Sequence, residues 1–168
     1  PVSLELETAP TGVEIVIEAL NEADLQILAL KPNSDAGSER IMAALEAAEQ
    51  HARLTLVSHL NRADYLSSLR HCTLLIGNSS SGIIEAASFG TPVVNVGSRQ
   101  NLRERNSNVI DVAVDVDSVR AGISQALALG RTDGANIFGD GQSSDRIVSA
   151  LRAIDLGDPS LMVKINAY

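Results

Sequence analysis

The chain has 168 residues, of which 45% are hydrophobic and 20% charged. This composition excludes an intrinsically disordered chain and predicts a single folded domain over residues 1–168. The net charge of −8 argues against binding to nucleic acid or to anionic membranes, because both attract basic surfaces. Aromatic residues make up only 2%, so the core must be aliphatic, as in strands that are buried on both faces of a sheet.

Strand and helix patterns alternate along the chain. In chain order, the expected elements are a helix at 8–22, a strand at 25–30, a helix at 37–50, a strand at 54–57, a helix at 61–70, a strand at 72–76, a short helix after Ser79, strands at 92–96 and 109–112, and helices at 116–129 and 143–154. This alternation predicts an α/β fold, a Rossmann-like parallel sheet with helices on both faces.

The sequence lacks the patterns of a membrane span, a signal peptide and a metal site. No apolar run has the length of a membrane span, and no signal peptide is visible, so a cytoplasmic location is predicted. The single cysteine, Cys72, borders an apolar strand and is expected to be a small buried residue. No His, Cys, Asp or Glu group has the spacing of a metal site, and no cofactor is predicted. The chain starts without Met and is expected to be a piece of a longer protein.

A run of small polar residues, Asn78-Ser79-Ser80-Ser81-Gly82, follows the strand at 72–76. Ligands of open parallel sheets bind outside the carboxyl ends of the strands, where free N–H groups and a helix dipole attract phosphate. The run therefore predicts an anion site formed by Ser79, Ser80, Ser81 and Gly82, where Gly82 would allow close approach to the backbone. The alternative is that one serine only caps the helix.

Three more residues are candidates for ligand binding at the carboxyl ends of the strands. Glu85 follows one turn into the helix, where its carboxylate can accept two ribose hydroxyls; the alternative is a first-turn Glu favoured by the dipole. Arg99 follows the strand at 92–96, and its fork of donors suits phosphate. Asn33 either binds the ligand or holds an Asx turn. Arg103 and Arg105 are expected in an exposed, solvated loop.

The run around Ser80 also nearly matches the Gly-x-Ser-x-Gly elbow of serine hydrolases. Those enzymes place their histidine after the serine, whereas His51, His59 and His71 all precede it. No nucleophile is therefore predicted.

Four separated motifs resemble the hydrolysing UDP-N-acetylglucosamine 2-epimerase family and occur in its order. They are Lys31–Ser38, Gly77–Ala86, Phe89–Gln100 and Phe138–Gly141. The resemblance covers nearly all of the chain. It implies the C-terminal half of a GT-B fold, in which two Rossmann-like domains enclose the active site.

The resemblance also implies the ligand and its contacts. UDP or a UDP-N-acetylhexosamine would bind with its diphosphate at Ser79, Ser80 and Arg99 and its ribose at Glu85, while Asn33 would reach the ligand from its own turn. The backbone near His59 would lie by the uracil. Position 102 is Leu where the family often carries Gly, so the loop after Arg99 is expected to differ in shape.

The family's reaction needs groups that this chain lacks. Enzymes of the family remove the C2 proton of the sugar, eliminate UDP and add water to release N-acetylmannosamine. The proton-transfer carboxylates belong to the N-terminal domain, and the family's histidine before a Pro-Val pair would precede Pro1. The resemblance therefore implies a fragment with no catalytic residue, inactive alone, whose partner is the missing N-terminal domain.

Two alternatives stay open. One is the donor domain of a GT-B glycosyltransferase, which shares the fold and the nucleotide. The other is a domain kept for assembly that has no ligand function. A homo-oligomer is compatible with each of these.

Overall fold

The computed structural model describes residues 9–33, 37–50 and 53–163. These residues belong to two compact units, which are divided between Asn136 and Ile137. A single domain over all 168 residues stays a prediction. Within the described ranges, no helix has the length and apolar character needed to cross a membrane.

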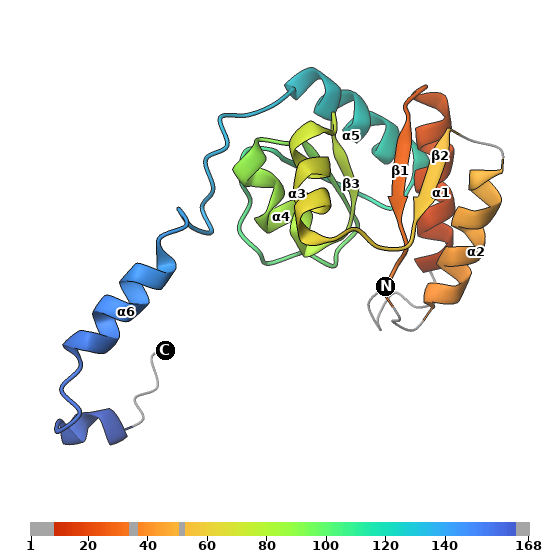
Figure 1. The fold of residues 1–168 in the computed structure, drawn as a ribbon. Coiled ribbons are helices and arrows are strands. Elements are labelled where there is room, and N and C mark those ends of the chain that lie inside the picture. Colours follow the sequence, from red (N-terminus) through yellow and green to blue (C-terminus); the bar gives the residue numbers. More distant parts are fainter. Residues whose placement is uncertain (1–8, 34–36, 51–52, 164–168) are drawn as a thin grey trace. The chain divides into compact units, whose positions relative to one another are not determined.

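The first unit alternates helices with short strands (Figure 1). Its elements are α1 (Ala9–Glu22), β1 (Ile27–Leu30), α2 (Ser38–Glu49), β2 (Leu54–Val57), α3 (Arg62–His71), β3 (Leu75–Gly77), α4 (Ser80–Ile84), the 3₁₀ turn η2 (Ala86–Phe89), β4 (Val93–Val96), β5 (Val109–Val112) and α5 (Val116–Leu129). Each predicted helix and strand of this unit is present, and β5 and α5 have the predicted bounds.

All paired strands are parallel, but they form two sheets. β1 pairs with β2, with Ile27 opposite Leu54, and the second sheet has the order β3–β4–β5. The Rossmann-like α/β fold is therefore confirmed, and in the described residues its parallel strands are divided between two sheets. β1 and β3, at the facing edges of the two sheets, are not paired with each other.

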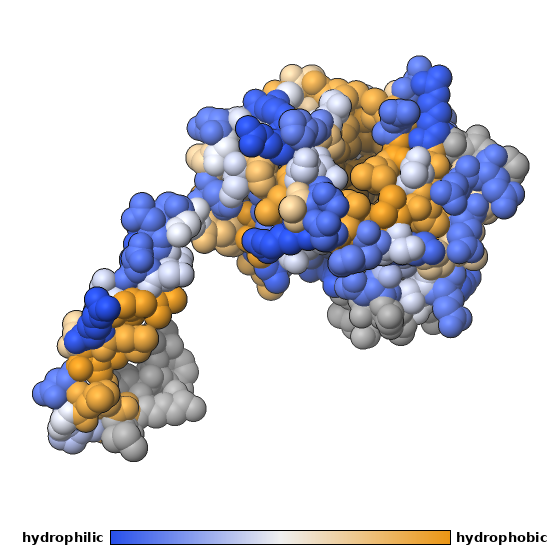
Figure 2. All heavy atoms as spheres, viewed as in Figure 1, coloured by the Kyte–Doolittle hydropathy of each residue, from blue (hydrophilic) through white to orange (hydrophobic). Residues whose placement is uncertain are grey.

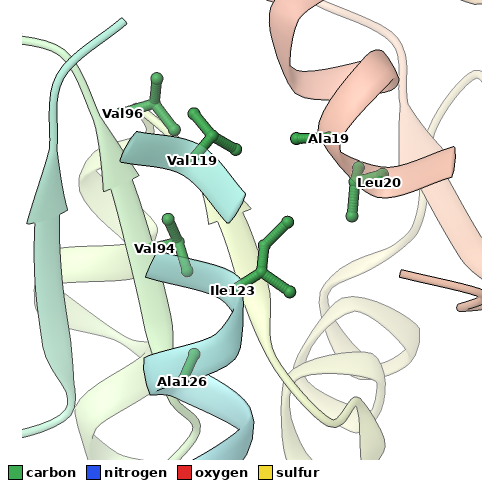
Figure 3. Close-up of a cluster of buried hydrophobic side chains, with 7 residues drawn as sticks. All are labelled: Ala19, Leu20, Val94, Val96, Val119, Ile123 and Ala126. Carbon is green, nitrogen blue, oxygen red and sulfur yellow. The ribbon is translucent and has the colours of Figure 1, made fainter. Parts of the chain in front are cut away.

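Helices cover both faces of β4, whose four residues are all buried. On one face, seven aliphatic side chains from α1, β4 and α5 pack together (Figure 3): Ala19, Leu20, Val94, Val96, Val119, Ile123 and Ala126. On the other face, Val93 packs with Leu69 of α3 and Ala86 of η2. Each buried Val, Leu or Ile contributes about 1.5–3 kcal/mol, so these two clusters hold β4 and the turn that follows it in place.

Polar side chains cap the N-terminal ends of two helices of this unit. Asn61 accepts a hydrogen bond from the Asp64 amide (2.9 Å) at the start of α3, and Asp115 accepts one from the Ser118 amide (2.8 Å) at the start of α5. α5 ends at Gly130, which has a positive φ of 62°. Each cap satisfies an amide that the helix itself leaves unpaired.

The segment after α5, expected to be a loop, is tied to the rest of the first unit. The Arg131 guanidinium donates to the carbonyls of Phe89 (2.9 Å) and Cys72 (2.7 Å), and Asn136 donates to the carbonyl of Ile84 (2.8 Å). These bonds satisfy the carbonyl groups at the ends of α4 and η2, so the segment stabilises the helix that carries the serine run.

The second unit contains α6 (Ser143–Ala153) and the 3₁₀ turn η3 (Pro159–Met162). Asp140, from the Phe138–Gly141 motif, forms an ion pair with Arg146 of α6 (2.6 Å). The hydrogen bond from Arg146, followed by one from the Gln142 amide, lowers the pKa of Asp140. α6 exposes an apolar face, visible in Figure 2, that includes Ile147 and Leu151.

Candidate functional site

The serine run and Arg99 lie in the turns after two neighbouring strands. β3 and β4 are hydrogen-bonded with Gly77 opposite Asn95, so both strands end at the same edge of the sheet. Gly77 has a φ of +146° and Gly97 a φ of +79°, conformations that residues with a side chain rarely adopt. These two glycines therefore shape the turns from which the candidate residues project.

Gln100 joins the two turns. Its side-chain amide donates to the carbonyl oxygen of Asn78 (2.8 Å), and only 4% of the residue is exposed. Arg105 in turn donates to the Gln100 carbonyl (2.9 Å). The turn that carries Arg99 is thus held directly beside the turn that carries the serines. The sequence alone predicted no role for Gln100. The one sequence feature that could have indicated a role is its position next to Arg99.

Asp111 on β5 stabilises this arrangement by accepting hydrogen bonds from Arg105 and Asn95. The Arg105 Nε donates to Asp111 Oδ2 (3.0 Å), and the Asn95 amide donates to Asp111 Oδ1 (2.6 Å). Burial raises the pKa of Asp111, but the hydrogen bonds from Arg105 and Asn95 and the charge of Arg105 outweigh it, so the pKa lies below 3.8. Arg105 is therefore a structural anchor, and the expectation that it lies in a solvated loop is wrong.

The three serines have different surroundings. Ser79 caps α4, because its Oγ accepts a bond from the Ser81 amide (3.3 Å), which confirms the capping role for this residue. The Ser81 Oγ accepts a bond from the Tyr65 hydroxyl (2.5 Å). Burial raises the pKa of Tyr65, so this hydroxyl stays a donor at neutral pH. Ser80 is exposed, and its hydroxyl has no partner in the part of the chain that the structure describes.

Gly82 is buried in α4 and packs against the sheet. A Cβ at this position would lie 2.9 Å from Val93 Cγ1 and 3.5 Å from Leu75 Cδ2. The absence of a side chain is therefore needed for helix–sheet contact. The predicted role of Gly82, close approach of a ligand, remains an untested proposal beside this packing role.

Glu85 follows directly after α4, at its C-terminal end, and does not lie in its first turn. α4 has five residues, and Glu85 is its C-cap, whose amide donates to the Ser81 carbonyl (2.9 Å). A carboxylate is disfavoured at the negative end of a helix dipole, so the explanation of Glu85 as a dipole-favoured first-turn residue is wrong. Its side chain is partly exposed and can accept hydrogen bonds from a ligand.

Arg99 and Asn33 are both exposed. Among the described residues, no carboxylate pairs with the Arg99 guanidinium, which leaves its donors available to an anion. Asn33 follows β1 and His59 follows β2, so both belong to the turns of the other sheet. The structure thus brings Ser79, Ser80 and Arg99 to one pair of turns, and it places Glu85 at the C-terminal end of α4 and Asn33 after a strand of the other sheet.

The loop after Arg99 keeps a glycine-type backbone although it carries Leu102. Leu102 has a φ of +68°, the left-handed conformation that glycine favours, and its side chain is fully exposed. The expectation that this loop differs in shape from that of other family members stays a prediction. The leucine adopts a conformation that is strained for a residue with a Cβ.

A family model described as UDP-N-acetylglucosamine 2-epimerase matches residues 4–152 of the chain. The chain belongs to this family. It is 42% identical over all 168 residues to a UDP-N,N'-diacetylbacillosamine 2-epimerase (hydrolyzing) of Legionella pneumophila and covers 44% of that protein. It is 29% identical over 143 residues, or 85% of its length, to a UDP-N-acetylglucosamine 2-epimerase of Neisseria meningitidis serogroup B, 38% of which is covered. The chain thus spans less than half the length of these epimerases.

Two solved structures share the fold of this family member. A UDP-GlcNAc 2-epimerase from Methanocaldococcus jannaschii matches with a TM-score of 0.69 at 14% identity, over 90% of this chain and 44% of that one. The same archaeal enzyme in complex with UDP-GlcNAc and UDP matches with a TM-score of 0.68 at 16% identity, over 89% of this chain and 42% of that one. At this identity the comparison confirms the Rossmann-like fold.

Proposed function

We propose that this chain is the C-terminal UDP-sugar-binding domain of a hydrolysing UDP-N-acetylglucosamine 2-epimerase with a GT-B architecture. The observation that carries the proposal is the pair of turns after β3 and β4, which Gln100 holds together through Asn78. The turn after β3 offers serine hydroxyls. The turn after β4 offers the guanidinium of Arg99, which pairs with no carboxylate among the described residues. Two adjoining turns with these donors suit a diphosphate.

The proposed contacts follow from the chemistry of each side chain. Arg99, Ser79 and Ser80 bind the diphosphate through charged and neutral donors. The Glu85 carboxylate, which has only acceptor sites when ionised, takes hydrogen bonds from the ribose hydroxyls. Asn33 reaches the ligand from the turn after β1. The chain has a net charge of −8, and the local positive charge of Arg99 would attract the anionic diphosphate.

In the whole enzyme, this domain acts on the leaving group. When the bond between C1 of the sugar and the diphosphate oxygen breaks, negative charge grows on UDP, and Arg99 stabilises that charge. Interactions with the nucleotide, remote from the reacting carbon, position the sugar. Carboxylates of the N-terminal domain remove the C2 proton, and water then adds to release N-acetylmannosamine. The 168 residues alone are therefore inactive.

The relatives define the nucleotide part of the proposed ligand better than its sugar part. The names of the Legionella and Neisseria relatives share UDP but differ in the sugar, which is N,N'-diacetylbacillosamine in the first and N-acetylglucosamine in the second. The ligand class that fits them all is a UDP-N-acetylhexosamine. The family assignment favours the epimerase over the glycosyltransferase donor domain.

Thermal unfolding with and without UDP tests the proposal. A ligand at 100 times its Kd adds about 2.7 kcal/mol to the free energy of unfolding, so millimolar UDP raises the Tm of the unmodified chain. Arg99→Ala and Glu85→Ala are expected to remove this shift. Arg103→Ala is the matched control, because Arg103 is also exposed in the same loop, and it keeps the shift. An equal shift in Arg99→Ala and Arg103→Ala contradicts the proposed contacts.

A further inference from the structure

Tyr65 connects the serine run to the neighbouring helix. It lies on α3, and its hydroxyl donates to the Oγ of Ser81 on α4 (2.5 Å), a partly buried contact between two helices that lie next to each other in Figure 1. The Tyr65 ring packs against Leu69, Ala86 and Val93, which are buried. The position of the hydroxyl is therefore fixed by the core and does not depend on a ligand.

The chemistry of the two hydroxyls decides which one donates. Burial raises the pKa of Tyr65 above its usual 10.0, so the phenol keeps its proton at neutral pH and donates it. A serine hydroxyl has one hydrogen and two lone pairs. Tyr65 occupies one lone pair of Ser81, so the serine hydrogen points elsewhere, and no group among the described residues accepts it. Ser81 is thus left as a donor whose direction is set by Tyr65.

Glu85 lies on the same face of α4 as Ser81. The Glu85 amide donates to the Ser81 carbonyl (2.9 Å), so the two residues are one helical turn apart, a spacing that brings side chains together. Burial is the largest influence on the pKa of Tyr65, and the negative charge of Glu85 raises it further, which agrees with a carboxylate close to the phenol. The directed donor and the carboxylate therefore adjoin the same tyrosine.

The structure divides the serine run into two parts. Ser79 and Ser80 are exposed, whereas Ser81 is partly buried against Tyr65. Ser81 therefore belongs with Glu85 and not with the proposed contacts to the diphosphate. Each ribose hydroxyl can both donate and accept a hydrogen bond, but ionised Glu85 offers only acceptors. A second group is needed to supply the donor, and Ser81 is that group.

We propose that Tyr65 is a positioning residue that holds the Ser81 hydroxyl as a donor to the ribose hydroxyls of a UDP-sugar, beside the acceptor Glu85. The inference rests on the proposed binding of UDP and assigns Tyr65 and Ser81 to the ribose part of that site. Glu85 accepts hydrogen bonds from the two hydroxyls, and Ser81 donates to one of them. The pair of Tyr65 and Ser81 consequently adds to the selection of ribonucleotides over nucleotides that lack these hydroxyls.

Affinities for UDP and for 2′,3′-dideoxy-UDP, which lacks both ribose hydroxyls, test the proposal. Tyr65→Phe keeps the aromatic ring and its packing and removes only the hydroxyl. It is expected to raise the Kd for UDP about fivefold, the effect of one hydrogen bond, and to leave the Kd for 2′,3′-dideoxy-UDP unchanged. In a Ser81→Ala background, Tyr65→Phe is expected to have no further effect, because the hydroxyl that it directs is gone.

Ser68→Ala is the matched control. It removes a serine hydroxyl of the same helix, one that donates to the Asp64 carbonyl (2.8 Å), and it is expected to leave both Kd values unchanged. The comparison between the two nucleotides is a readout that a merely structural role of Tyr65 would not move, because a distorted site loses affinity for both.

The outcomes separate this inference from the proposed function. If the unmodified chain binds UDP and Tyr65→Phe binds it equally well, the positioning role is wrong and the UDP site stands. If Tyr65→Phe weakens the binding of both nucleotides equally, or if its effect persists in the Ser81→Ala background, the tyrosine acts through the general structure of the site and the proposal is overturned. If the unmodified chain does not bind UDP at millimolar concentration, the proposed function fails and this inference fails with it.

Discussion

Replacement of Gly82 by alanine tests how the serine-bearing helix is seated on the sheet. The added Cβ would lie 2.9 Å from Val93 Cγ1, about 0.5 Å closer than the 3.4 Å at which ordinary contact begins. Val93 is 2% exposed and packs with Leu69 and Ala86, so it cannot move without cost. Overpacking of this kind costs about 1–3 kcal/mol, and the better helix propensity of alanine returns about 1. The net loss in the free energy of unfolding is therefore up to about 2 kcal/mol.

Urea denaturation of four chains measures this loss: the unmodified chain, Gly82→Ala, Val93→Ala and the double variant. Removal of the two Val93 methyl groups opens the space, so Gly82→Ala is expected to cost almost nothing in the Val93→Ala background. The two changes therefore couple by about 1 kcal/mol or more. Gly12→Ala is the control, because its Cβ would meet Val114 at an ordinary 3.5 Å, and it is expected to be neutral or stabilising.

Two results refute the reasoning. If Gly82→Ala costs the same with and without Val93, the contact does not cause the loss. If Gly82→Ala leaves the free energy of unfolding unchanged but abolishes the response to UDP, then the residue serves the ligand and not the packing of α4.

Three further predictions concern stability. Leu102→Gly is expected to raise the free energy of unfolding in urea by about 0.5–1 kcal/mol, since it relieves the left-handed backbone and removes no packing; a loss contradicts this. Asn61→Ala removes the cap of α3 and is expected to cost about 1 kcal/mol in the same assay, whereas Asn61→Ser keeps an acceptor for the Asp64 amide and most of the stability. Asp111 has a lowered pKa, so its contribution is present above the unfolded pKa of 3.8 and is lost as the pH falls through the lower folded value. In pH-dependent denaturation, Asp111→Asn is therefore expected to be less stable at neutral pH and to lose less stability below pH 3.8; an unchanged acid limb contradicts this.

Local patterns predicted most of the elements. The bounds of α5 follow from signals within a few residues of each end, Asp115 as cap and Gly130 as stop. The strand at Val109–Val112 is likewise a short apolar run between polar turns. Such elements are predictable because their determinants are adjacent in sequence.

The pairing of strands and the burial of polar residues were not predictable in this way. β1 and β3 are not paired with each other in the described residues, and no pattern in either strand reports its neighbour. Gln100 is buried because it reaches a carbonyl 22 positions away, and Arg105 is anchored by Asp111 on the next strand. Each of these contacts is made only once the chain has folded.

The same limit applies within the candidate site. The strand-to-helix turn, the serines and Arg99 were placed correctly at the strand ends by the motif spacing. The length of α4 was not, because the switch to a 3₁₀ turn at Ala86 depends on packing against α3. Glu85 consequently lies at the C-terminal end of the helix, as its C-cap.

The most direct test of the central claim is an amide NMR titration of the ¹⁵N-labelled chain with UDP, in parallel with a titration with uridine. If the turns after β3 and β4 hold the diphosphate, UDP shifts the amide signals of Ser79, Ser80 and Arg99, and uridine at the same concentration leaves them in place. Equal shifts with UDP and uridine, or UDP-induced shifts confined to other residues, contradict a diphosphate site at these turns.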